Sequence, residues 1–295
     1  MTVHLALAAA LALASALAFA VATVAQQRAA AESSDEDARG GRFVGQLIRN
    51  PRWLAAMLGT GVAYALQAAA LGVGSVIVVQ PILVTSLVFA LPLSVYLAHE
   101  RLPKSVVGSG LVLTVSLAVF VILGNADNGV SHASHQDWLI VAVIGVPVVA
   151  GCLIFAQPRA GAARASLLAI AVGLLGGVLA VLTKAVVASG GDGIVHLLTT
   201  GETYALVAVG VSGIYLQQLS FQAGALQASL PIMTVLEPVI AALLGLTLLH
   251  EQLQVGGLRM TVLVAAALAM TVATVALARA RARTSTSTTS TTSTS

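Results

Sequence analysis

The sequence predicts an all-α integral membrane protein of nine transmembrane helices, with two inverted four-helix repeats joined by a linking fifth helix. Three observations carry this prediction: the composition, the run of apolar segments, and an internal similarity at an offset of 151 residues. The chain of 295 residues is 58% hydrophobic and only 8% charged, whereas a soluble domain carries roughly 25% charged residues. So few charges cannot cover a surface that faces water. We therefore expect the chain to lie in a lipid bilayer, as a multi-pass protein of the cytoplasmic (inner) cell membrane.

The apolar segments divide the chain in order, because a helix needs about 20 apolar residues to cross the hydrocarbon layer. The predicted first repeat, 3–124, contains spans 3–25, 53–72, 75–98 and 106–124. The linking span is 138–157, and the second repeat, 165–279, contains spans 165–189, 203–223, 225–249 and 257–279. The first segment has no Lys or Arg before it and is long, so we interpret it as an uncleaved span rather than a secretory leader.

The basic residues predict the orientation, because Lys and Arg accumulate on the cytoplasmic side of a membrane. With the N-terminus outside, nine spans leave only Arg259 on the outer side, and Lys184 lies within a span. The other basic residues all fall inside: Arg28, Arg39, Arg42, Arg49, Arg52, Arg101, Lys104, Arg159, Arg164, Arg279, Arg281 and Arg283. This predicts an N-out, C-in topology, since eight or ten spans would move the three C-terminal arginines to the other face.

The last twelve residues, 284–295, contain only Thr and Ser. Such a segment has no apolar side chains with which to pack, so we expect a disordered tail.

Several classes of protein are disfavoured by what the sequence lacks. The single cysteine, Cys152, excludes an intramolecular disulfide and a cysteine metal cluster. The histidines show no HExxH-like spacing, and the chain has no GxxxxGK[ST] phosphate-binding loop. We expect no enzymatic activity, no cofactor, no metal site and no nucleic-acid partner, and we leave a homodimer open.

An internal repeat is visible when residues 64–102 are compared with residues 215–253. Ten of the 39 positions match. Among them are Tyr64 with Tyr215, Gln67 with Gln218, and the His-Glu pairs of HERL and HEQL. Five crossings separate the first span from the sixth, so the second copy is inverted. Inverted repeats are common in secondary transporters, whose substrate site lies near the membrane midplane between the halves.

The segment LEPVIAALLGLTLLHEQL, residues 236–253, resembles the end of an EamA-type repeat of the drug/metabolite transporter superfamily. The nine spans, the first-repeat segment ending in HERL, and LTKAVV in the sixth span resemble the NIPA-type branch more closely. The resemblance implies a helical bundle with inverted pseudo-symmetry, alternating access and movement of a small solute. The EamA-type branch is associated with export of metabolites and cations, and the NIPA-type branch with magnesium. The first copy has Ser86 at the position of Glu237, so the two halves are not equivalent.

The sequence places a carboxylate, Glu237, in the interior of an apolar run and directly before Pro238. A charge at this depth costs several kcal/mol unless it is protonated, paired or facing water. Pro238 and Pro231 each leave a backbone carbonyl without its helical partner, and such carbonyls can line a cavity. Pro81 is a similar helix break in the third span. We predict that Glu237 takes part in a substrate or proton pathway; the alternative is a structural Glu paired across helices.

Further polar residues in the spans complete the predicted pathway. Lys184 either extends its side chain to the membrane surface or pairs with Glu237. The remaining candidates offer hydrogen bonds to a cavity or between helices: Gln67, Gln80, Gln218, Tyr64 and Tyr215. Glu251, at a span end, is expected to form a turn. Gly173 and Gly177 form a GxxxG pattern, which predicts close helix packing.

We therefore expect a secondary transporter of the drug/metabolite type that moves a small solute, either a metabolite or an organic cation. Coupling of this transport to protons is one mechanism that the sequence allows. One alternative is a NIPA-like transporter of magnesium or another divalent cation. An alternative of another class is a membrane scaffold that does not transport and acts through its basic first loop and its tail.

Overall fold

The computed structural model describes residues 2–31, 51–97, 104–124, 129–130, 133–191, 193–223, 226–252 and 255–292. All regular structure in these ranges is helical, which confirms the predicted all-α class. The first half contains α1 (Thr2–Ala31), α3 (Pro51–Val73), α4 (Val76–Leu83), α5 (Ser86–Leu97) and α6 (Lys104–Gly124). The second half contains α7 (His135–Ala156), α8 (Gly161–Gly190), α9 (Ile194–Thr199), α10 (Gly201–Ala223), α11 (Leu226–Thr247) and α12 (Leu258–Thr292).

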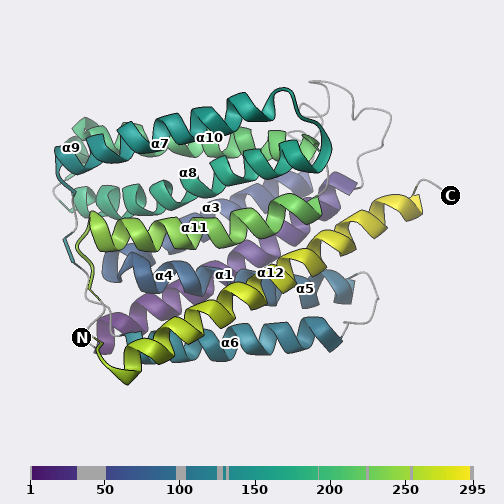
Figure 1. Cartoon of the computed structure of the whole chain (residues 1–295), viewed down its shortest axis with the longest axis horizontal. Coiled ribbons are helices and arrows are strands. Elements are labelled where there is room, and N and C mark those ends of the chain that lie inside the picture. Colours follow the sequence, from purple (N-terminus) through teal and green to yellow (C-terminus); the bar gives the residue numbers. More distant parts are fainter. Residues whose placement is uncertain are drawn as a thin grey trace.

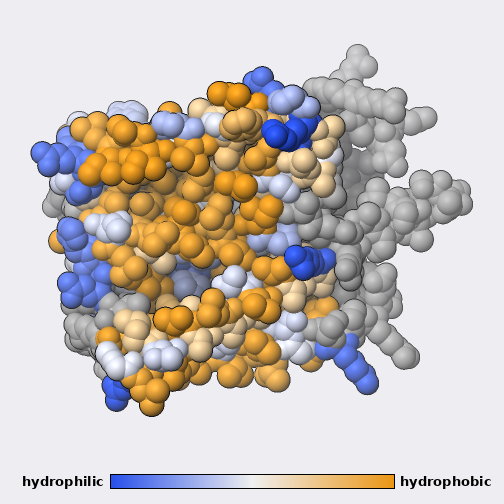
Figure 2. Space-filling model, viewed as in Figure 1, coloured by the Kyte–Doolittle hydropathy of each residue, from blue (hydrophilic) through white to orange (hydrophobic). Residues whose placement is uncertain are grey.

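The long helices run side by side along one axis of the molecule (Figure 1). The face in Figure 2 carries a broad hydrophobic band, and hydrophilic residues gather toward its two ends. Eight helices in the described part of the chain are long and apolar enough to cross a membrane. The chain is thus a multi-pass helical membrane protein.

The predicted span 203–223 coincides with α10, which is not among those eight helices. At 23 residues α10 is long enough, but it begins beside Glu202 and carries Gln217, Gln218 and Gln222 near its end. Residues 218, 221 and 222 of α10 lie outside the residues whose side chains the structure describes, so the count of eight does not test this span.

The third predicted span, 75–98, is not one continuous helix. It is divided into α4 and α5 by a turn at Val84 and Thr85. Pro81 lies inside α4 near the break, and the Thr85 hydroxyl donates to the carbonyl of Ile82 at 2.6 Å. A proline removes one amide donor from the helix, and here the Thr85 hydroxyl supplies one of the donors at the turn.

The tail also differs from the prediction, because α12 continues to Thr292. The sequence predicts disorder from residue 284. The difference has a simple physical origin: extending an existing helix is far easier than starting one. Ser and Thr can therefore add turns to α12 although they would not form a helix alone.

Helix packing positions the site. α1 packs mainly on α3, α8 packs on both α10 and α11, and α6 packs on α12, while α4 lies against α11. A Cβ added to Gly173 would lie 2.8 Å from Leu236 Cβ, and one added to Gly177 would lie 2.5 Å from Ile240 Cγ2. Only glycine permits this approach of α8 to α11, so the predicted close packing at the GxxxG pattern is confirmed.

Candidate functional site

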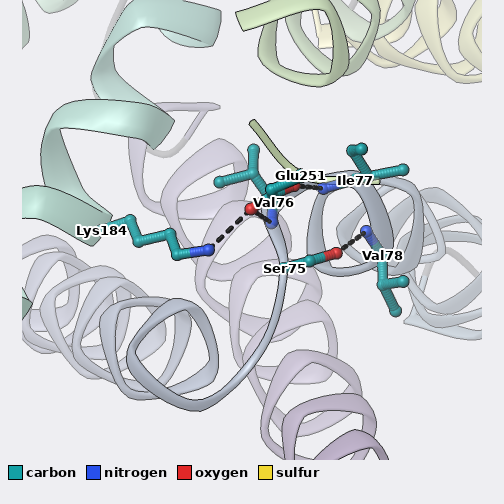
Figure 3. Close-up of polar contacts among 6 residues, drawn as sticks. All are labelled: Ser75, Val76, Ile77, Val78, Lys184 and Glu251. Atoms are coloured by element: carbon teal, nitrogen blue, oxygen red, sulfur yellow. Dashed lines mark hydrogen bonds and ion pairs between the residues drawn. The ribbon is translucent and has the colours of Figure 1, made fainter. Parts of the chain in front are cut away.

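A buried charge cluster joins three parts of the chain: α8, the turn after α11 and the start of α4 (Figure 3). The Glu251 carboxylate accepts a 2.6 Å ion-pair hydrogen bond from Lys184 Nζ through Oε1. The same oxygen accepts from the amide of Val76 at 2.8 Å, and Oε2 accepts from the amide of Ile77 at 3.0 Å. Glu251 is only 1% exposed and Lys184 only 5%. One carboxylate thus satisfies a buried ammonium and two of the free amides at the start of α4.

The start of α4 is prepared for this contact by its own sequence. Gly74 lies so close to α1 that an added Cβ would be 2.5 Å from Ala8 Cβ. Ser75 then caps α4, its hydroxyl accepting from the amide of Val78 at 3.2 Å. The serine side chain satisfies one free amide and Glu251 two others, so the N-terminal dipole of α4 faces a negative charge.

The turn after α11 brings Glu251 to this position. His250 has a left-handed backbone with φ of 51°, and the amide of Glu251 donates to the carbonyl of Gly245 at 3.0 Å. Gly245 also makes room for the side chain, because an added Cβ would lie 2.9 Å from Glu251 Oε2. The amide of Val130 donates to the carbonyl of Leu249 at 2.7 Å and ties the α6–α7 connection to the turn.

This cluster corrects the expectation for Lys184. The sequence offers two alternatives, a side chain that extends to the surface or one that pairs with Glu237. In the structure the Lys184 side chain is buried and its acidic partner is Glu251. The depth along the helices explains the choice, because about three turns of α11 separate Glu237 from the turn that holds Glu251.

Glu237 occupies the middle of α11 and points toward α8. A Cβ added to Gly176 would lie 3.0 Å from Glu237 Cγ, 3.1 Å from Cδ and 3.2 Å from Oε2. The carboxylate is partly buried and lies within electrostatic range of Tyr64 on α3. Among the described residues no hydrogen bond to this carboxylate is found. Glu237 therefore lies beside a glycine and near the Tyr64 hydroxyl, without a hydrogen-bond donor among the described residues. Glu251, in contrast, accepts hydrogen bonds from three donors.

A cavity of about 260 Å³ opens on the other side of α11. Figure 2 shows the hollow between α11 and α12. Two of the predicted helix breaks, Pro81 and Pro238, line it, whereas Pro231 and Glu237 do not. Its polar lining consists of Thr234, Thr271 and Thr274, and the rest is apolar.

The other predicted pathway residues are spread over several helices. Gln67 and Gln80 are buried, and Nε2 of Gln80 has no hydrogen-bond partner among the described residues. Tyr64 is 47% exposed and contacts Phe19 edge to face at 4.9 Å between ring centroids, while Tyr215 is 63% exposed. The side chain of Gln218 lies outside the described residues. In the described ranges no three His, Cys, Asp or Glu side chains come together as metal ligands.

Glu251 and the start of α4 are the part of the site that the sequence prediction omits. One feature of the sequence does point to Glu251: the segments HERL and HEQL occupy equivalent positions in the two repeats. The HERL segment itself, residues 99–102, lies outside the described residues. No sequence signal connects Glu251 to Val76, which is 175 residues earlier.

The comparisons with known proteins name no activity. The chain is 37% identical over 234 residues to an uncharacterized protein of Corynebacterium glutamicum, covering 79% of this chain and 81% of the relative. The two proteins belong to one family. No protein-family profile matches the chain, and no solved structure matches it.

Proposed function

We propose that the protein is a secondary transporter of the drug/metabolite type that moves a small solute, a metabolite or an organic cation, across the cytoplasmic membrane. One observation carries the proposal: Glu237 lies mid-helix in α11, between Pro231 and Pro238, against the space left by Gly176. A carboxylate at this depth, without hydrogen bonds from the described residues, is costly unless it binds something. A proton or a cationic group of the cargo provides that partner, which is the basis for proposing a proton-coupled cycle.

The proposed topology has nine crossings, with α10 as the seventh. The start of α1 and the end of α12 lie at opposite ends of the bundle (Figure 1), and an odd number of crossings produces that arrangement. Eight helices are apolar enough to span, and α10 has 23 residues beside them. With the twelve basic residues on the cytoplasmic side, the end that holds Glu251 and Lys184 faces outward.

The proposed inverted repeats are supported by the packing of the two halves. In the first half α1 packs on α3 and on α4 and α5; in the second half α8 packs on α10 and α11. The halves meet where α4 lies against α11 and α6 against α12. α7, the proposed linking helix, packs on α8 and exposes most of its surface.

The test is flux through the purified full chain in liposomes loaded with a pH-sensitive dye. Amino acids and organic cations are added outside one at a time, and an active solute is expected to move protons. Protein-free liposomes and liposomes with the Glu237→Gln variant are the controls. Failure of every solute to move in wild-type liposomes would contradict the transport proposal.

Two further readouts separate the alternatives. A magnesium-sensitive dye inside the same liposomes reports the NIPA-like activity, in which Mg²⁺ itself would be the cargo. A scaffold would show no flux, and its cellular phenotype would follow deletion of the first loop or the tail. Metabolite profiling of a deletion strain then narrows the range of solutes for the flux assay.

A further inference from the structure

The cavity between α11 and α12 is long and narrow. On α11 its lining runs from Thr234 to Leu246, and on α12 it runs from Met260 to Thr274. At 1.5 Å per residue, these stretches extend about 18 Å and about 21 Å along the bundle. A volume of about 260 Å³ spread over that length leaves room only for a slender group. The cavity is thus a slot that runs parallel to the helices, and we call it the α11–α12 slot.

The slot lies where the two halves of the chain meet, and it opens toward lipid. Its wall on the side of the first half is formed by residues of α4 and α6: Ile77, Pro81, Val84 and Phe120. Two lining residues at the opening, Val239 and Val264, are 44% and 52% exposed. The hollow in Figure 2 lies within the hydrophobic band of the molecule. An occupant can therefore enter sideways from the hydrocarbon layer.

The lining of the slot suits a hydrocarbon better than water. Thr234 Oγ1 already donates to the carbonyl of Leu230 within α11. Thr271 Oγ1 donates to the carbonyl of Ala267 within α12 at 2.9 Å. A buried water needs several polar partners, and the remaining lining is almost entirely apolar. An empty slot is also unfavourable, because its lining atoms would lack contacts on one side. An apolar chain from the bilayer supplies those contacts.

A positive charge lies at one end of the slot. Arg259 is exposed and immediately precedes Met260, the first lining residue on α12. It also lies four residues before the lining residue Leu263, which places it at the edge of the same helix face. Side chains on a helix tilt toward its N-terminus, so the guanidinium extends toward the end of the bundle where the slot begins. A basic side chain in this position attracts the phosphate of a lipid headgroup.

Two further features match a phospholipid. The hydrocarbon layer is about 30 Å thick, so one leaflet is about 15 Å deep, and the slot extends slightly farther than that from Arg259. In the proposed topology Arg259 is also the one basic residue outside the spans that lies on the outer side. Lys and Arg accumulate on the opposite side, and a lipid phosphate gives Arg259 a reason to be the exception.

We propose that the α11–α12 slot binds one acyl chain of a membrane phospholipid and that Arg259 holds the phosphate of the same lipid. The chain fills the junction between α4 and α6 of the first half and α11 and α12 of the second. The site depends only on binding, and Glu237, which faces α8, is not part of it. Absence of this lipid would leave the transport proposal intact, and absence of transport would leave the lipid site intact.

The test is binding of added phospholipid to the full chain, measured by native mass spectrometry. The protein is purified in digitonin, whose rigid ring system is too wide for the slot, and dipalmitoyl phosphatidylglycerol is added back in steps. Ala267→Leu places three more carbons in the slot and is expected to weaken binding of one lipid by about tenfold or more. Ala265→Leu is the matched control, because Ala265 is exposed on the same helix and does not line the slot. Equal affinities in the two variants overturn the proposal.

A second pair of variants covers the case in which Ala267→Leu does not fold. Val264 lies at the exposed opening of the slot, so Val264→Phe narrows the entrance without adding volume to the core. Leu268→Phe is its control, since Leu268 is 63% exposed and does not line the slot. Val264→Phe is expected to bind the lipid more weakly than Leu268→Phe, and equal binding overturns the proposal in the same way.

The phosphate contact is tested with its own variant. Arg259→Gln is expected to weaken binding of phosphatidylglycerol by about fivefold and to leave binding of the neutral dipalmitoylglycerol unchanged. Arg164→Gln is the control, because Arg164 is another exposed arginine, at the start of α8. Equal affinities for phosphatidylglycerol in Arg259→Gln and Arg164→Gln overturn the phosphate contact.

Other occupants of the slot give different results. Glycerol phosphate has the charge without the chain and is expected not to compete with the lipid. A small apolar solute such as naphthalene has no phosphate. If naphthalene stabilises the wild type but not Ala267→Leu while added phospholipid binds both alike, the slot takes small apolar molecules and the lipid proposal is overturned.

Discussion

Glu251 and Glu237 are carboxylates of the same half of the molecule, in or next to α11, and their surroundings are opposite. Glu251 is fully buried and accepts from Lys184, Val76 and Ile77. Glu237 is partly buried, lies against Gly176 and has Tyr64 within electrostatic range. The Glu251 carboxylate is satisfied by hydrogen bonds within the chain. The Glu237 carboxylate still has its acceptor atoms available for a proton or a ligand.

Both environments are created by α8. At Lys184 this helix provides a charged donor, and about two turns away at Gly176 it provides only space. A charge in a site of low dielectric needs donors or it needs a ligand. The same residue type therefore becomes a fixed element or a binding element according to what the facing helix offers.

The largest effect is expected from removing one partner of the fixed carboxylate. Lys184→Met leaves Glu251 buried beside two amides without its cation, and breaking a buried ion pair costs about 3–5 kcal/mol. Thermal or denaturant unfolding in detergent measures the loss. Glu237→Gln in the same assay should stay within about 1 kcal/mol of the wild type, because no described residue donates a hydrogen bond to Glu237. Equal losses of stability in Lys184→Met and Glu237→Gln would contradict the difference between the two carboxylates.

The next effect concerns the packing of α8 on α11. A Cβ at Gly177 would lie 2.5 Å from Ile240 Cγ2 and 2.9 Å from the backbone nitrogen of Ala241. Gly177→Ala must therefore push the helices apart, at about 1–3 kcal/mol. Gly61→Ala on α3 is the matched control, since nothing lies within 4 Å of its added Cβ. A Gly177→Ala chain as stable as Gly61→Ala would show that the two helices are not in close contact.

A smaller change in stability is expected at Gly176. The atoms nearest to its added Cβ belong to the flexible Glu237 side chain, the closest at 3.0 Å. Gly176→Ala should cost less than about 1 kcal/mol, because the carboxylate can turn aside. Flux should fall in the same variant, since the moved group is the one proposed to bind. Normal flux together with normal stability in Gly176→Ala would show that the contact between Gly176 and Glu237 is not needed for transport.

The smallest effect is expected from the tail. Truncation after Arg283 removes Ser and Thr residues that have no apolar groups to pack. Melting temperature, membrane insertion and flux should all stay at wild-type values. Loss of insertion in the truncated chain would assign the end of α12 a structural role.

The sequence predicts the fold class well because apolar length and glycine spacing are local properties. Seven of the nine predicted spans correspond to long helices among the eight candidates, and α4 and α5 together form another. The sequence predicts a helix break at Pro81, and α4 does end close after it, whereas α11 continues unbroken through Pro231 and Pro238, where the sequence also predicts breaks. Proline inside a membrane helix produces either a kink or a full break, and the neighbouring helices decide between them.

The site is predicted less completely because its contacts are between distant residues. The depth of Glu237 in α11 follows directly from its place in an apolar run. The partner of Lys184 does not, because Glu251 is 67 residues away and reaches it only through the left-handed turn at His250. The two amides at the start of α4 carry no side-chain signal at all. Backbone donors of this kind become visible only when the helices are placed in space.

The pH dependence of flux in Glu237→Gln proteoliposomes, compared with Glu237→Asp and the wild type, tests whether the Glu237 carboxylate carries the proton of the transport cycle. Gln keeps the shape and hydrogen-bonding capacity of the side chain but cannot take up or release a proton. We expect a folded Glu237→Gln protein whose pH-dependent flux is abolished, and a Glu237→Asp protein with partial flux and a changed pH profile. A Glu237→Gln protein that transports at the wild-type rate with the wild-type pH profile would contradict this expectation.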